Sequence, residues 1–202
     1  MGALQDQDNA CAARDAAHAT DAEFLAHPEE SASSRTARAR RRRFALFIPV
    51  AIVWIVIDQV SKAYVDGTFQ PGQVISDPIV GIFRFHYVCN TGGAWSIFSG
   101  ATWALVAFSL VVCAALVVYL FVSAREASAG EAFGLALVVA GGIGNAIDRF
   151  TLGFVVDFIE PTFIDFPIFN IADIGVTCGF VIFFVALLAR EHANSKKGGA
   201  TE

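Results

Sequence analysis

The sequence predicts an all-α membrane protein: a four-transmembrane-helix bundle with a small β-sheet on its outer surface and both termini in the cytoplasm. Hydrophobic residues make up 55% of the chain, and the mean hydropathy is +0.58. Charged residues make up only 16%, whereas soluble domains carry about 25%. In addition, four segments reach the roughly 20 apolar residues that a helix needs to cross a bilayer.

The four apolar segments are expected at about 44–64, 101–123, 131–150 and 170–190. A bilayer interior accepts only helices or closed barrels, because every backbone polar group must be paired within the protein. The run from 105 to 121 is apolar almost throughout, whereas barrel strands alternate apolar with polar residues. The segments are therefore predicted to be helices. Residues 44–190 would form one membrane domain, followed by a cytoplasmic tail at 191–202.

Residues 1–43 are expected to be a cytoplasmic tail, acidic at first and then rich in arginine. Residues 1–34 have few side chains that can pack, so we expect them to be disordered. The basic run at 35–43 adjoins an apolar segment and has no folded basic face around it, which argues against nucleic-acid binding. A cleaved secretory signal is also excluded, since Asp58 and Lys62 stand where its small-residue cleavage site would lie.

Basic residues outside the spans predict the orientation of the bundle. They precede the first span, lie between the second and third, and follow the fourth: Arg35, Arg38, Arg40 to Arg43, Arg125, Arg190, Lys196 and Lys197. Cytoplasmic loops of membrane proteins carry an excess of Lys and Arg. We therefore expect residues 65–100 and 151–169 to face outward.

The outward segment between the first two spans contains a strand pattern. Aromatic and polar residues alternate there: Phe83, Phe85 and Tyr87 with Arg84 and His86. A period of two is typical of a strand with one buried face. Together with residues 73–76, this strand would form a small sheet on the membrane surface, with its aromatic face toward lipid. The alternative is a partly ordered loop with interfacial aromatic residues.

Polar residues within the spans gather near the outward face. A charge inside a bilayer costs at least about 2.5 kcal/mol, so each one needs a partner, a cavity or a function. The residues concerned are Asp58, Lys62, Asn145, Asp148, Arg149, Asn170 and Asp173, with Asn90 and Asp157 in the outward segments. The cytoplasmic halves of the spans carry almost none. This distribution predicts a polar site near the outer leaflet.

Structural ion pairs explain part of this cluster. Asp58 and Lys62 are four residues apart on one helix face and can pair, and Asp148 with Arg149 has the same interpretation. Asp157 and Asp173 have no adjacent base. Two carboxylates in a poorly solvated site cannot both ionise easily, so they share a proton and titrate as a unit. One can then activate water while the other protonates a leaving group, which is the chemistry of an aspartic peptidase.

Five motifs follow one another along the chain: Asp58-Gln-Val-Ser-Lys62, Asn90-Thr-Gly-Gly-Ala-Trp-Ser96, Gly144-Asn-Ala-Ile-Asp-Arg149, Val155-Val-Asp157-Phe and Phe169-Asn-Ile-Ala-Asp173. Through these motifs, residues 44–190 resemble the lipoprotein signal peptidase family, the type II signal peptidases. The resemblance implies that Asp157 and Asp173 are a catalytic dyad. They would cut diacylglyceryl-modified prolipoproteins before the lipidated cysteine, at the outer leaflet of a bacterial cell membrane.

The resemblance also implies supporting or substrate-binding roles for Asp58, Lys62, Asn90, Gly92, Asn145, Asp148, Arg149, Asn170 and Ala172. The segment 65–100 corresponds to the family's outer surface sheet, which cradles the substrate. The expected partners are lipid-modified prolipoproteins and membrane lipid, with no nucleic acid. We expect a monomer that uses neither a metal nor a cofactor.

Three other functions fit the sequence less well. A transporter or channel needs polar residues along a route through the membrane, but the inner halves of the spans are nearly featureless. A Ser/Lys peptidase would use Ser61 or Ser96 with Lys62, yet Ser61 and Lys62 are consecutive and point apart on a helix. Metal chemistry lacks a ligand motif, because the histidines are dispersed at 18, 27, 86 and 192.

Small residues and cysteines near the motifs have structural interpretations. Close backbone approach and ordinary helix packing both remain open for Gly141, Gly142 and Gly144, while Gly92 and Gly93 would permit close approach. The four cysteines are scattered, and we expect them to be packing residues rather than a disulfide framework.

Overall fold

The computed structural model describes residues 28–92, 102–123 and 126–198. The chain divides into two compact units, residues 1–41 and 42–202. Residues 28–41, the described part of the first unit, are helical. The helix thus includes residues 28–34 of the tail that is expected to be disordered, and the Arg and Ala abundant in the following residues 35–43 are good helix formers. The remainder of the tail, residues 1–27, lies outside the described residues.

Four long helices follow one another: α2 (Pro28–Thr68), α3 (Thr102–Ser123), α4 (Ala129–Thr151) and α5 (Ile171–Gly198). Each contains a segment long and apolar enough to cross a membrane. The four predicted helices are confirmed, although α2 and α5 extend beyond the predicted bounds. The start of α4 is locally encoded, since Ser128 Oγ accepts from Glu131 N at 3.1 Å and Glu131 Oε1 accepts from Ser128 N at 2.9 Å. This reciprocal pair is a capping box.

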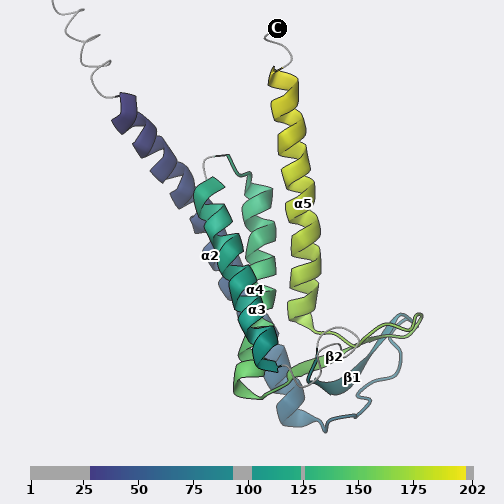
Figure 1. The fold of residues 1–202 in the computed structure, drawn as a ribbon. Helices are drawn as coiled ribbons and strands as arrows, with labels where there is room; N and C mark the ends of the chain where they lie inside the picture. The colour runs from purple at the N-terminus through teal and green to yellow at the C-terminus, as the bar shows by residue number, and fades with distance from the viewer. Residues whose placement is uncertain (1–27, 93–101, 124–125, 199–202) are drawn as a thin grey trace, which may run out of the picture. The chain divides into compact units, whose positions relative to one another are not determined.

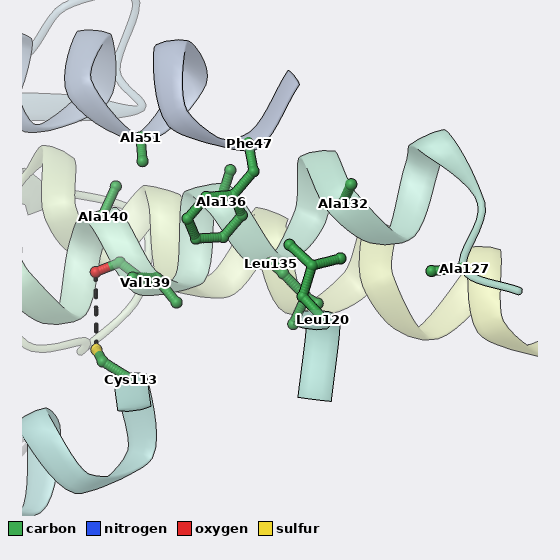
Figure 2. Close-up of a cluster of buried hydrophobic side chains, with 10 residues drawn as sticks. All are labelled: Phe47, Ala51, Cys113, Leu120, Ala127, Ala132, Leu135, Ala136, Val139 and Ala140. Atoms are coloured by element: carbon green, nitrogen blue, oxygen red, sulfur yellow. Dashed lines mark hydrogen bonds between the residues drawn. The ribbon is translucent and has the colours of Figure 1, made fainter. Parts of the chain in front are cut away.

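Helix α4 is the packing centre of the bundle. In the most apolar segment of α4, 61% of the residues are buried, against 17% in the corresponding segment of each of the other three helices. Figure 2 shows Ala136 and Ala140 of α4 beside Phe47 and Ala51 of α2. The outward-facing apolar surfaces of the other helices suit a lipid surrounding, where no aqueous solvent opposes their exposure.

Two antiparallel strands, β1 (Phe83–Asn90) and β2 (Val155–Pro161), form a sheet at the end of the bundle where α5 begins (Figure 1). The predicted strand at 82–88 is thus confirmed, but its main partner is β2 rather than residues 73–76. Residues 73–76 also pair with β1, through a bridge between Val74 and His86 and backbone hydrogen bonds from Ile75 N to Phe85 O at 2.8 Å and from Tyr87 N to Gln73 O at 3.0 Å. Pro71 and Pro78 flank that segment and lack the N–H groups that a longer ladder would need.

Tyr87 anchors the sheet to the bundle. Its side chain is fully buried among Val65 of α2 and Val156 and Phe158 of β2. Its hydroxyl donates a hydrogen bond to Asp66 near the end of α2. Burial, and then the hydrogen bond to the Asp66 carboxylate, raise the pKa of the Tyr87 hydroxyl. The sheet is therefore held by both apolar packing and a buried polar contact.

Candidate active site

The start of α5 places Asp173 through a local capping arrangement. Asn170 precedes the helix, and its Oδ1 accepts from Asp173 N at 3.1 Å. In return, Asp173 Oδ2 accepts from Asn170 N at 3.2 Å. Asparagine is among the preferred N-cap residues, and a side chain that reaches back to the cap amide completes the box. The orientation of the Asp173 carboxylate thus follows from how the helix begins.

Asp157 lies on β2 and is only 2% exposed. Its Oδ1 accepts from Asn170 Nδ2 at 2.7 Å and its Oδ2 accepts from Asn90 Nδ2 at 2.9 Å. Burial, followed by the nearby charge of Asp173, raises the pKa of Asp157 to about 7, while the two amide hydrogen bonds act in the opposite direction. Asp157 is therefore a buried strand residue poised to hold a proton near neutral pH.

Two asparagines connect the carboxylates. Asn170 contacts both Asp157 and Asp173. Asn145 of α4 donates from Nδ2 to Asp173 Oδ1 at 2.7 Å, and its Oδ1 accepts from Asn170 Nδ2 at 3.0 Å. Both aspartates line one cavity of about 450 Å³, together with Asn90, Asn145 and Arg149. The structure therefore brings together two acids that lie on different elements.

Lys62 is a buried cation next to the site, and its ammonium group has three oxygen partners. Its Nζ lies 3.0 Å from Asp58 Oδ2 and 3.1 Å from Asp148 Oδ2. It also donates to Asn145 Oδ1 at 2.9 Å. The predicted pairing of Asp58 with Lys62 is confirmed. Lys62 contacts the same Asn145 that holds Asp173, so the ion pair and the two acids belong to one network.

The carboxylates paired with Lys62 also hold the elements that carry the acids. Asp58 Oδ1 accepts from Ala172 N at 2.8 Å, next to Asp173. Asp148 Oδ2 accepts from Val156 N at 3.1 Å, next to Asp157. The site thus depends on the backbone amide of Ala172 rather than on its side chain. A spacing argument cannot find such contacts, because they join residues far apart in the chain.

Arg149 has different partners from those expected. The interpretation that pairs it with Asp148 is wrong, since Asp148 faces Lys62. Arg149 Nη2 donates to Gly92 O at 2.8 Å and its Nη1 donates to Asn145 O at 3.3 Å. Consecutive helical residues point in different directions, which separates Arg149 from Asp148. Arg149 therefore holds the backbone that follows β1.

The segment after β1 is only partly described. Gly92 N donates to Asn90 Oδ1 at 2.9 Å, which orients the Asn90 amide toward Asp157. Gly93 and Ser96 lie outside the described residues. Ser61, the other serine considered as a nucleophile, donates to the backbone oxygen of Asp58 at 2.7 Å. Ser61 is therefore bonded to its own helix.

Gln59 is a site residue that the sequence reasoning missed. Its Nε2 donates to Asp58 Oδ2 at 3.1 Å, to Asp148 Oδ1 at 3.0 Å and to Gly144 O at 3.2 Å. The signal was available, because Gln59 is a polar residue in an apolar span and lies within the first motif. It was overlooked although the amides Asn90, Asn145 and Asn170 were found.

The arrangement suits hydrolysis by an activated water. The two acids share a cavity, and their carboxylate oxygens accept hydrogen bonds from side-chain amides rather than from basic side chains. Within the described ranges, no three His, Cys, Asp or Glu side chains are placed to hold a metal ion. The polar groups that line the cavity are two carboxyls, two amides and one guanidinium, together with the residues Thr177 and Cys178, which carry a hydroxyl and a thiol.

Comparison with known proteins gives a family match over most of the chain. Residues 50–189 match the family model described as "Signal peptidase (SPase) II". The chain is 40% identical over 147 residues to the lipoprotein signal peptidase of Lactococcus lactis subsp. cremoris (strain MG1363), covering 71% of this chain and 93% of that protein. It is 40% identical over 134 residues to the lipoprotein signal peptidase of Synechocystis sp. (strain ATCC 27184 / PCC 6803 / Kazusa), covering 66% of this chain and 82% of the relative.

Two solved structures of a bacterial membrane enzyme have a similar fold. One, at 2.3 Å resolution, has a TM-score of 0.64 and 34% sequence identity, and covers 71% of this chain and 87% of its own. The other, at 1.9 Å resolution, has a TM-score of 0.63 and 34% identity, and covers 70% and 92%. The likeness therefore extends to the membrane domain as a whole.

Proposed function

The chain belongs to the signal peptidase II family of peptidases, and on this premise we propose that it is an aspartic endopeptidase using Asp157 and Asp173. Its substrates are prolipoproteins that carry a diacylglyceryl group, cut before the lipidated cysteine. The protein is a multi-pass bacterial membrane protein.

The contact of Asn170 with both carboxylates carries this proposal. Asn170 Nδ2 donates to Asp157 at 2.7 Å, while Asn170 N donates to Asp173 at 3.2 Å. A residue that binds both acids holds them at one place, where their mutual repulsion favours a shared proton. Neither acid has a salt bridge with a Lys, Arg or His among the described residues. A shared proton is what an acid–base pair needs for amide hydrolysis.

The reaction requires no covalent intermediate. The ionised member of the pair removes a proton from a water molecule as the water oxygen attacks the scissile carbonyl carbon. The protonated member donates a hydrogen bond to the carbonyl oxygen. When the tetrahedral intermediate collapses, the C–N bond breaks and the leaving nitrogen takes a proton from the pair. The products are a free carboxylate and the free amine of the lipidated cysteine.

The orientation is part of the proposal. With both termini cytoplasmic, the sheet and the start of α5 lie at the outer leaflet. Arg42 and Arg43 lie before the apolar part of α2 and Lys196 lies near the end of α5, as the positive-inside rule requires. A substrate anchored by lipid in the outer leaflet then reaches the acids by diffusion in the membrane plane.

The test is the conversion of a lipidated precursor, followed by gel shift. Asp157→Asn and Asp173→Asn are each expected to lower the rate at least about a hundredfold, since each removes one half of the acid–base pair. Asp165→Asn is the matched control, because Asp165 is an exposed acid in the loop between them. Full processing by either dyad variant would refute the proposal, provided that membrane insertion is equal in all variants.

A further inference from the structure

A second cavity lies beside the candidate active site. Its volume is about 730 Å³, within the range of ligand pockets. Every residue that lines it is Ile, Phe or Pro, contributed by the two strands, Ile82 just before β1, the loop after β2 and the start of α5. An apolar cavity of this size next to a polar site calls for a ligand that has both kinds of group.

The two cavities share a wall. Phe166, Phe169 and Ile174 line both of them. The rings of Phe166 and Phe169 stack edge to face, with centroids 6.2 Å apart. A molecule that is held at the acids can therefore extend past this wall into the apolar cavity without crossing the protein core.

The face of the sheet leads from one cavity to the other. Asp157, Ile159 and Pro161 alternate along β2 and lie on one face, opposite Val88, Phe85 and Phe83 of β1. Of the β2 residues on this face, Ile159 is the first that lines the apolar cavity; it is two residues from Asp157, or about 6.6 Å along a strand. In a diacylglyceryl cysteine, the first ester oxygen is six bonds from the cysteine nitrogen, about 7 Å in an extended chain with bonds near 1.5 Å. This length matches the separation of Asp157 and Ile159 along the strand.

We propose that the apolar cavity binds the acyl chains of the substrate's diacylglyceryl group and sets the preference for their length. This assignment rests on the proposed function, which places the cysteine nitrogen at the acids. Ile82 and Ile164 line the cavity at its exposed edge, with 52% and 51% exposure. Their side chains have the position to decide how much of an acyl chain is covered.

The test compares two synthetic lipopeptides that differ only in their acyl chains, dihexanoyl and dipalmitoyl. Ile82→Trp and Ile164→Trp fill the cavity and are expected to lower kcat/KM for the dipalmitoyl substrate about tenfold relative to the dihexanoyl one, the equivalent of displacing roughly two methylenes. The effect should fall on KM. Val74→Trp is the matched control, because Val74 is similarly exposed, at 48%, and lines neither cavity.

An unchanged ratio of kcat/KM between the dipalmitoyl and the dihexanoyl substrate would overturn the assignment, whether both values fall together or neither changes. It would indicate that bilayer lipid occupies the cavity. Normal cleavage of the dihexanoyl substrate would leave the proposed function intact in that case. Failure of the unsubstituted protein to cleave either lipopeptide would overturn the function and the assignment together.

A photoreactive group at the end of an acyl chain gives a second readout that needs no turnover. In the Asp157→Asn protein, adducts are expected on the peptides that carry Ile82 or Ile164. Adducts confined to α3 would contradict the assignment.

Discussion

Lys62 illustrates, at the scale of one residue, why a cation lies inside this membrane domain. Its ammonium group has three acceptors, Asp58, Asp148 and Asn145, at 2.9 to 3.1 Å. A buried charge is tolerated only when it is paired and hydrogen-bonded. The carboxylates of Asp58 and Asp148 also accept hydrogen bonds from the backbone amides beside Asp173 and Asp157. Lys62 thus neutralises Asp58 and Asp148, the two carboxylates that position the acids. It does not contact the carboxylates of Asp157 or Asp173 themselves.

The pH dependence of activity follows from Asp157. Its pKa is raised to about 7, chiefly by burial and then by Asp173, so the shared proton is lost as pH rises through that value. Without this proton the pair cannot protonate the leaving nitrogen, and we expect kcat to fall above about pH 7.

The variant Asn90→Ala tests the direction of this effect. The hydrogen bond from Asn90 lowers the pKa of Asp157. Removing it should raise that pKa further and move the alkaline limb of the kcat profile to higher pH, by roughly half a unit to one unit. Thr91→Ala, at an exposed neighbour, should leave the limb in place. A limb that moves to lower pH in Asn90→Ala would contradict this account of the site.

At the scale of elements, the packing of α4 against α5 decides where Asp173 lies. Gly141 and Gly134 of α4 meet the backbone of α5 at Ala172 and Gly179. For Gly141, the choice between close approach and ordinary packing is settled by contact with a carbonyl oxygen. Gly144 lies against the Asp58 carboxylate, where a Cβ would meet Oδ2 at 2.5 Å. These glycines therefore set the spacing between the helices and the polar network.

The substitution Gly141→Ala should disrupt this spacing. Its Cβ would clash with Ala172 O and lie 2.8 Å from Val176 Cγ2. Helix α5 must then move, and the expected result is a loss of about 1–3 kcal/mol in stability with reduced activity. Gly67→Ala in α2 is the matched control, since nothing lies within 4 Å of its Cβ. Thermal unfolding in detergent should show a lower Tm for the first variant alone, and equal Tm values would contradict the packing argument.

At the scale of the whole molecule, one polar network joins three helices and the sheet. Lys62 comes from α2, Asn145 from α4, Asp157 from β2 and Asp173 from α5. Such a network is stable in a membrane only when its members satisfy one another. The fold and the site therefore depend on the same contacts.

The proposed orientation is testable in intact cells. In a protein whose native cysteines have been replaced, a thiol reagent that cannot cross the membrane should label Asp77→Cys, before β1, but not Glu191→Cys, near the end of α5. Both positions are exposed, so their labelling depends on the side of the membrane they occupy. Equal labelling of the two after permeabilisation is the control. Labelling of Glu191→Cys alone before permeabilisation would reverse the orientation.

The sequence by itself determined the four helices and the group of residues that form the site. Length and apolarity suffice for the helices, because a membrane segment must pair its own backbone groups. Charge suffices to find Asp58, Lys62 and Asp173, because a charge is conspicuous in an apolar span, and Asp157, because it stands between apolar neighbours in an outward segment. Gln59, an uncharged residue within the first motif, was missed.

Only the tertiary structure decided which of these residues meet. The partner of β1, the pairing of Asp148 with Lys62 and the contact of Asn170 with both acids join segments that are distant in the chain. Helical and strand periods determine only the face on which a residue lies. Which faces come together depends on the packing of α4 with its neighbours and on how β2 folds back before α5, and these are properties of the assembled bundle.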